Sequence, residues 1–97
     1  MTAQATEDYL AVDLGAESGR AAVGQFDGER LVLREVVRFP NEATHLPTGL
    51  YWDVLGLYRQ ILNSIRAAFA DGCQPVSLGI DTWGVDFGLL DVTGDLI

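Results

Sequence analysis

The chain has 97 residues, which is enough for one domain at most, and 48% of them are hydrophobic, which supports a folded core. The net charge is −8, because the chain has 14 acidic residues, six arginines and no lysine. A surface of this charge repels polyanions, so nucleic acid and anionic membranes are excluded as favoured partners. The single cysteine, Cys73, excludes an internal disulfide and a cysteine-rich zinc site.

The first eight residues are polar and acidic, without the basic and apolar segments of a signal peptide. Residues 1–8 are therefore predicted to be a disordered tail, and residues 9–97 the folded part. No apolar run approaches the length of a membrane helix. These features predict a cytoplasmic protein.

Three strands are predicted in the first half of the chain. Residues 9–14 are almost entirely apolar, and residues 20–26 are again β-prone. Asp27-Gly28 is a hairpin turn signal, and residues 31–39 alternate apolar and charged side chains. Pro40 ends this strand and opens a loop over residues 40–49, rich in polar residues and proline.

A helix follows, and then two further strands. Asp53 is the predicted N-cap of a helix ending at residue 70, since apolar residues recur there at helical spacing, and Gly72 is the stop signal. Residues 76–81 and 85–91 are predicted strands, with a turn at Thr93-Gly94. Antiparallel strands followed by a helical crossover predict an α/β fold with a mixed sheet and a helix on one face.

One helix cannot cover both faces of such a sheet. The chain is therefore expected to be the front part of a larger molecule, whose remainder is a missing partner. The exposed sheet is expected to promote self-association.

The first candidate site follows the first strand. Asp13 stands near the strand end, and a turn containing Gly15, Ala16, Ser18 and Gly19 comes next. Exposed backbone N–H groups and the serine hydroxyl can donate to phosphate oxygens, while the carboxylate can reach hydrated Mg²⁺. A hairpin with a glycine-rich turn and no ligand explains the pattern equally well. Walker and dinucleotide-binding patterns are absent.

The second candidate site repeats this arrangement at the end of the strand over residues 76–81. Asp81 ends an apolar strand, and Trp83, Gly84 and Asp86 follow. Strand ends are where open sheets place ligands, and an indole can pack on the C–H face of a sugar. A tight turn with a buried tryptophan and surface acids is the equally weighted structural alternative.

Other residues favour structural roles. His45 lacks nearby metal-ligating partners and is predicted to be an ordinary loop residue. Trp52-Asp53 is predicted to anchor and cap the helix. No Ser/His/Asp or Cys/His relay can be assembled.

Two motifs resemble a known family. Residues 11–20, AVDLGAESGR, resemble the first phosphate motif of the sugar-kinase, actin and Hsp70-like superfamily. Residues 79–87, GIDTWGVDF, are similar to the rhamnulokinases among the FGGY carbohydrate kinases. Residues 38–41 and 49–53 are similar to that family too. The resemblance implies a ribonuclease H-like fold, of which this chain is an incomplete first domain.

The resemblance also implies residue roles. It implies that Asp13 helps to organise Mg²⁺, through water. Asp81, the second strand-end carboxylate, is a weaker candidate metal ligand. The resemblance implies two further groups: an ATP phosphate-binding group, Ala16, Glu17, Ser18, Gly19 and Arg20, and a sugar-binding group, Gly84 with Trp83 and Asp86.

The implied reaction transfers the γ-phosphoryl group of ATP to the 1-hydroxyl of L-rhamnulose, with ATP and Mg²⁺ as cofactors. The family's catalytic base, an aspartate of a later motif, has no counterpart here. This chain therefore contains no catalytic residue and is expected to be inactive alone. Glu17 stands where many relatives carry a small polar residue, so its side chain is expected to point away from phosphate.

Two other hypotheses remain open. The chain could be a non-catalytic nucleotide-binding or regulatory module of the same superfamily, which predicts nucleotide binding without sugar. It could also be a small interaction domain that binds neither ligand. Titration with Mg-ATP and with L-rhamnulose distinguishes the three.

Overall fold

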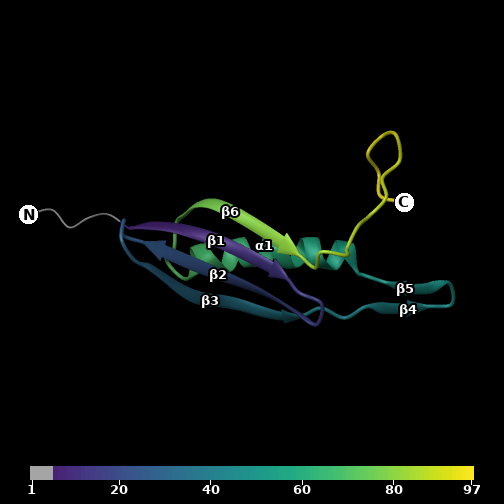
Figure 1. Ribbon diagram of the computed structural model, residues 1–97, viewed down its shortest axis with the longest axis horizontal. Helices are drawn as coiled ribbons and strands as arrows, with labels where there is room; N and C mark the ends of the chain where they lie inside the picture. Colours follow the sequence, from purple (N-terminus) through teal and green to yellow (C-terminus); the bar gives the residue numbers. More distant parts are fainter. Residues whose placement is uncertain (1–5) are drawn as a thin grey trace, which may run out of the picture.

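The computed structural model describes residues 6–97, and its main element is a four-stranded sheet (Figure 1). The strand order is β3-β2-β1-β6. The strands are β1 (Glu7–Leu14), β2 (Ser18–Phe26), β3 (Leu31–Pro40) and β6 (Pro75–Thr82). β2 pairs antiparallel with β1 and β3, whereas β6 pairs parallel with β1. The predicted mixed α/β sheet is confirmed.

The core lies on one face of this sheet. Leu10, Val12 and Leu14 alternate along β1 and are all buried, as are Ala21 and Val23 of β2. Because side chains alternate between the two faces of a strand, the odd-numbered residues of β1 lie on the opposite face. Asp13 is therefore on the face away from the core.

Helix α1 (Val54–Ala70) covers the core face, as Figure 1 shows. The Asp53 carboxylate accepts a 3.0 Å hydrogen bond from the backbone N–H of Gly56, so the predicted N-cap is confirmed. Ala68 is fully buried, while Leu57 and Ile61 pack partly buried against the sheet. The helix leads directly into β6, the parallel neighbour of β1.

A β-bulge adapts β3 to the helix. Ala21 is paired with Val37, but the next residue, Ala22, is paired with Glu35, so Val36 is an extra residue. As a result Val36 and Val37 both pack against the core.

The predicted loop over residues 40–49 is wrong in part. It contains β4 (Thr44–Leu46), which pairs antiparallel with β5 (Gly49–Tyr51) to form a separate two-stranded sheet. His45 lies in β4 and is exposed, rather than in a loop. Gly49 has a φ of +147°, a conformation that glycine adopts easily, and it lets the chain reverse after Pro47-Thr48.

The predicted strand over residues 85–91 is wrong. Within it, only Leu90 makes a β-bridge, to Leu96. The chain turns after β6, where the N–H of Asp86 donates to the carbonyl of Trp83 at 2.9 Å. A strand needs a neighbour to satisfy its backbone, and β6 remains an edge strand of the described sheet.

Most of the predicted disordered tail lies outside the described residues, because the structure describes nothing before residue 6. β1 begins at Glu7, two residues earlier than predicted. The strands predicted over residues 20–26, 31–39 and 76–81 and the helix agree with the structure to within two residues. The turns at Asp27-Gly28 and Thr93-Gly94 are confirmed, with positive φ at both glycines.

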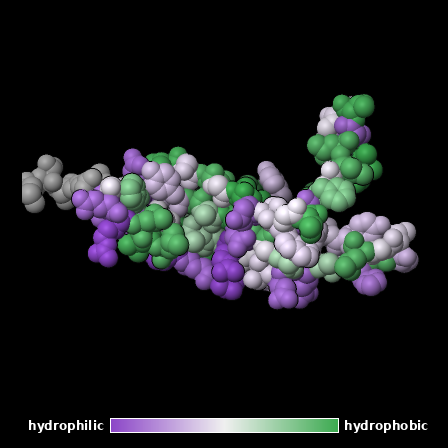
Figure 2. All heavy atoms as spheres, in the orientation of Figure 1, coloured by the Kyte–Doolittle hydropathy of each residue, from purple (hydrophilic) through white to green (hydrophobic). Residues whose placement is uncertain are grey.

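The described chain is elongated and leaves much apolar surface exposed. Its radius of gyration is 16.5 Å, whereas about 13 Å is typical for this length. Val76, Leu78 and Ile80 of β6 are 44–64% exposed. The segment after β6 is largely hydrophobic and projects from the body of the molecule (Figure 2). Among residues 6–97, no helix is long and apolar enough to cross a membrane.

Candidate phosphate and sugar site

Asp13 and Asp81 are direct neighbours on adjacent strands. They are register partners in the parallel β1–β6 pair, so their side chains lie on the same face of the sheet. A shallow groove of about 280 Å³ runs along this face, lined by residues of both strands including Gly79. A Cβ atom at Gly79 would have no neighbour within 4 Å, so the groove is open there.

This pair of carboxylates is electrostatically coupled. The pKa of Asp81 is raised above its ordinary value, chiefly because its side chain shares a hydrogen bond with Asp13, and further because of desolvation and the negative charge of Asp13. Arg20, opposite Asp13 on β2, places its Nε 3.6 Å from a carboxylate oxygen. Arg20 thus pairs with Asp13, one of the two acids at the strand ends.

The donor set fits a magnesium ion. Mg²⁺ prefers oxygen ligands and is usually held by one or two carboxylates, several waters and the phosphates of a nucleotide. Asp13 and Asp81 supply two neighbouring carboxylates on a solvent-accessible face. The described residues contain no cluster of three or more metal-ligating side chains.

The hairpin between β1 and β2, residues 15–19, follows directly after this pair. Gly15 is in a tight turn, since a Cβ there would lie 2.7 Å from the carbonyl oxygen of Ser18. Gly19 lies under the Phe39 ring, which a Cβ would approach to 2.1 Å. Glu17 is exposed at the hairpin tip, and Ala16 is half-buried.

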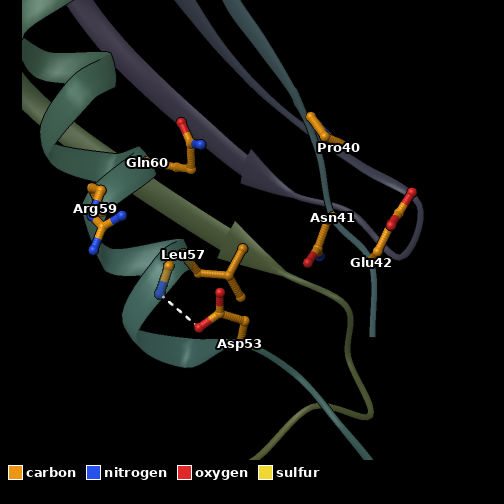
Figure 3. A pocket seen from close by; sticks show the side chains of 8 residues that line it. Pro40, Asn41, Glu42, Asp53, Leu57, Arg59 and Gln60 are labelled. Atoms are coloured by element: carbon orange, nitrogen blue, oxygen red, sulfur yellow. Dashed lines mark hydrogen bonds between the residues drawn. The ribbon is translucent and has the colours of Figure 1, made fainter. Parts of the chain in front are cut away.

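Asn41 of the segment after β3 holds this hairpin from one side. Its side-chain amide donates to the carbonyl of Gly15 at 2.6 Å, and its backbone N–H donates to the carbonyl of Glu17 at 3.1 Å. Asn41 also lines a pocket of about 190 Å³ with Glu42 and with Asp53, Leu57, Arg59 and Gln60 near the start of α1 (Figure 3).

The sugar-site residues lie just beyond the end of β6. Trp83 is 51% exposed, and a Cβ at Gly84 would meet nothing within 4 Å. Asp86 is half-buried, and it accepts a 2.7 Å hydrogen bond from the indole Nε1 of Trp52. This bond ties the loop after β6 to the segment that leads into α1.

The structure therefore brings both candidate sites to the same end of the sheet, where β1 and β6 end side by side (Figure 1). Sequence reasoning did not find the contacts of Asn41 and Trp52 with these loops. An asparagine shortly after a strand and a tryptophan beside a helix cap have many structural explanations. The one available signal was that Asn41 and Trp52 lie in residues 38–41 and 49–53, the two segments that resemble the carbohydrate-kinase family.

Comparison with known proteins finds relatives of this chain by sequence. No protein-family model matches the chain. It is 50% identical over 82 residues to a rhamnulokinase of Oceanobacillus iheyensis, covering 84% of this chain and 17% of that protein. It is also 44% identical over 91 residues to one from Bacteroides thetaiotaomicron, and 39% over 87 residues to one from Bacillus subtilis. These matches cover 94% and 90% of this chain but 19% and 18% of the relatives.

These matches cover most of the chain, so over nearly its whole length it is similar to one part of several sugar kinases named rhamnulokinase. Within that class it corresponds to an N-terminal portion of the rhamnulokinases. The chain spans less than a fifth of the length of the curated relatives that it matches.

Proposed function

We propose that this chain binds Mg-ATP and a ketose sugar as the front segment of an ATP-dependent kinase that phosphorylates L-rhamnulose at its 1-hydroxyl. The observation that carries the proposal is the adjacency of Asp13 and Asp81 on the open face of the sheet. A solvent-accessible pair of like charges is unfavourable without a cation. Among the residues that the structure describes, the cation paired with Asp13 is Arg20, at 3.6 Å.

The hairpin from Ala16 to Arg20 is proposed to bind the ATP phosphates through backbone N–H groups and the Ser18 hydroxyl. Asp13 is proposed to hold Mg²⁺ through water, and Asp81 to assist. When bound, the ion neutralises phosphate charge and orients the terminal phosphoryl group. Glu17 is exposed, which leaves room for its side chain to point away from the phosphates.

The loop after β6 is proposed to form part of the sugar site. Trp83 is half exposed and can pack against the apolar face of a sugar ring. Gly84 lets the ligand approach the backbone closely, and the Asp86 carboxylate can accept hydrogen bonds from sugar hydroxyls. The tie between Asp86 and Trp52 supports a fixed position for this loop.

The sheet order and the single crossover helix are consistent with a ribonuclease H-like first domain, and this fold assignment is part of the proposal. The catalytic base is proposed to lie in a part of the kinase that this chain does not contain. That missing part is also the proposed cover for the exposed sheet. The cytoplasmic location and the self-association of the isolated chain stay predictions.

The first test is a titration of the chain with Mg-ATP and with L-rhamnulose, followed by amide chemical shifts. The proposal predicts shifts at residues 13–20 with Mg-ATP and at residues 81–86 with the sugar. Asp13→Asn should weaken Mg-ATP binding, with Glu29→Gln as a control for loss of one charge. Binding of nucleotide without sugar would support the regulatory-module alternative, and binding of neither would favour an interaction domain.

The second test supplies the remainder of a kinase. This chain replaces the matching segment of the Oceanobacillus iheyensis rhamnulokinase, and ATP-dependent phosphorylation of L-rhamnulose is measured. The proposal predicts an active chimera that loses activity on Asp13→Asn. A folded but inactive chimera would count against the kinase assignment, and robust activity of the 97 residues alone would contradict the expectation that the catalytic base lies elsewhere.

A further inference from the structure

Asn41 is an unusual residue among those that the structure describes. It is only 6% exposed, and Ser64 is the other buried polar residue of the described chain. Burying an amide is costly unless its hydrogen-bonding groups find partners. The partner of its side-chain nitrogen is the Gly15 carbonyl, 26 residues away in sequence and in the candidate phosphate hairpin.

Two carbonyl groups of that hairpin point at Asn41. The side-chain amide donates to the Gly15 carbonyl at 2.6 Å, and the backbone N–H donates to the Glu17 carbonyl at 3.1 Å. In a planar trans peptide, the carbonyl and the following N–H point in opposite directions. The N–H groups of Ala16 and Ser18 therefore point away from Asn41. Both residues belong to the set proposed to bind ATP phosphates.

The adjoining residues make the contact rigid. Pro40 has a fixed φ and no N–H, which restricts the backbone just before Asn41. Phe39 is 4% exposed and its ring packs directly on Gly19, the last residue of the hairpin. The hairpin is thus held at its start and middle by Asn41 and at its end by Phe39.

We infer that Asn41 is a positioning residue for nucleotide binding: it fixes the Gly15–Gly19 hairpin so that the N–H groups of Ala16 and Ser18 are directed toward the phosphates of Mg-ATP. This inference rests on the proposed function and adds a residue that contacts no ligand itself. Without the side-chain amide, the Gly15 peptide loses its partner and can rotate. The hairpin then presents its donors in several orientations. Ordering them on phosphate binding costs conformational entropy, which weakens the binding.

The test compares Asn41→Ala and Asn41→Asp with the unaltered chain. Asn41→Asp keeps the shape of the side chain, but a carboxylate cannot donate to the Gly15 carbonyl. Gln60→Ala is the matched control, since it removes an amide from the same pocket (Figure 3) while leaving the hairpin contacts intact. Amide hydrogen exchange of residues 15–19 and of Val12 and Val23 in the core is measured for each chain.

Loss of a single buried hydrogen bond predicts hairpin exchange about tenfold faster in both Asn41 variants. Core exchange should stay unchanged, as should all exchange in Gln60→Ala. This local pattern separates positioning from a general loss of stability, which would raise exchange in the core as well. Equal hairpin exchange in Asn41→Ala and the unaltered chain, or faster exchange everywhere, would overturn the inference.

The affinity for Mg-ATP is then measured by calorimetry, with Mg-tripolyphosphate as a probe that lacks the nucleoside. The inference predicts that both Asn41 variants bind both ligands about tenfold more weakly, while Gln60→Ala binds as the unaltered chain does. Unchanged affinity despite faster hairpin exchange overturns the role in nucleotide binding. If the unaltered chain binds neither probe while its hairpin still depends on Asn41, the proposed function fails and the structural contact stands.

Discussion

The indole Nε1 of Trp52 donates a 2.7 Å hydrogen bond to the Oδ1 of Asp86 across 34 residues of sequence. This bond joins the segment before α1 to the loop after β6, and both residues are half-buried. It holds a carboxylate of the proposed sugar site at the end of the sheet where Asp13 and Asp81 lie.

Trp52→Phe keeps an aromatic ring but removes the donor. We expect a loss of about 1 kcal/mol in the local stability of the loop, because a half-buried carboxylate loses its partner. Hydrogen exchange of residues 83–88 should therefore become faster. Trp83→Phe is the matched control, since the Trp83 side chain is half exposed. Equal exchange in the two variants would show that the bond does not order this loop.

Gly19→Ala tests the contact between the candidate phosphate hairpin, residues 15–19, and β3. The new methyl group would lie 2.1 Å from the Phe39 ring, which is itself buried. Overpacking of this kind costs about 1–3 kcal/mol in the free energy of unfolding, measurable by urea denaturation. Gly79→Ala, also within a strand of the sheet, meets no atom within 4 Å and should change stability much less. The prediction is wrong if the two substitutions cost the same.

Asp53→Ala tests the start of α1. Loss of the carboxylate that accepts from the Gly56 N–H should lower the free energy of unfolding by about 1 kcal/mol. Asp53→Asn retains a side-chain oxygen that can accept this bond, so it should recover most of the loss. Thermal unfolding followed by helix circular dichroism measures both, and an Asn variant as unstable as the Ala variant would argue against the cap.

The Asp13–Asp81 pair predicts a pH dependence of stability. The pKa of Asp81 is raised above its ordinary 3.8 in the folded chain, chiefly through the hydrogen bond with Asp13. The folded state thus binds this proton more tightly than the unfolded chain does. The associated stabilisation is present below pH 3.8 and is lost as the pH rises through the raised pKa.

Asp81→Asn removes the titrating carboxyl group of residue 81 and its charge repulsion with Asp13. In the absence of metal, its melting temperature near pH 7 should exceed that of the unaltered chain, and should depend less on pH above about pH 4. Addition of Mg²⁺ should raise the melting temperature of the unaltered chain more than that of the variant. Glu29→Gln, a change of the same charge at an exposed turn, should do neither. A lower melting temperature for Asp81→Asn near pH 7 would contradict the repulsion argument.

Sequence alone predicted the elements that carry strong local signals. The apolar run before Asp13 is a strand, the apolar spacing after Asp53 is a helix, and Asp27-Gly28 is a turn. The strand predicted at residues 85–91 was wrong because its apolar pattern was read without a partner strand. A hairpin at residues 44–51 was missed because its strands are only three residues long.

The order of residues along the chain also determined the chemistry at the two strand ends, since a carboxylate followed by small residues is visible in one dimension. Tertiary structure alone decided that Asp13 and Asp81 are neighbours, because the parallel register of β1 and β6 depends on a crossover through α1. It likewise decided what Asn41 and Trp52 do. Their hydrogen bonds span 26 and 34 residues, and such contacts form only once packing has brought distant segments together.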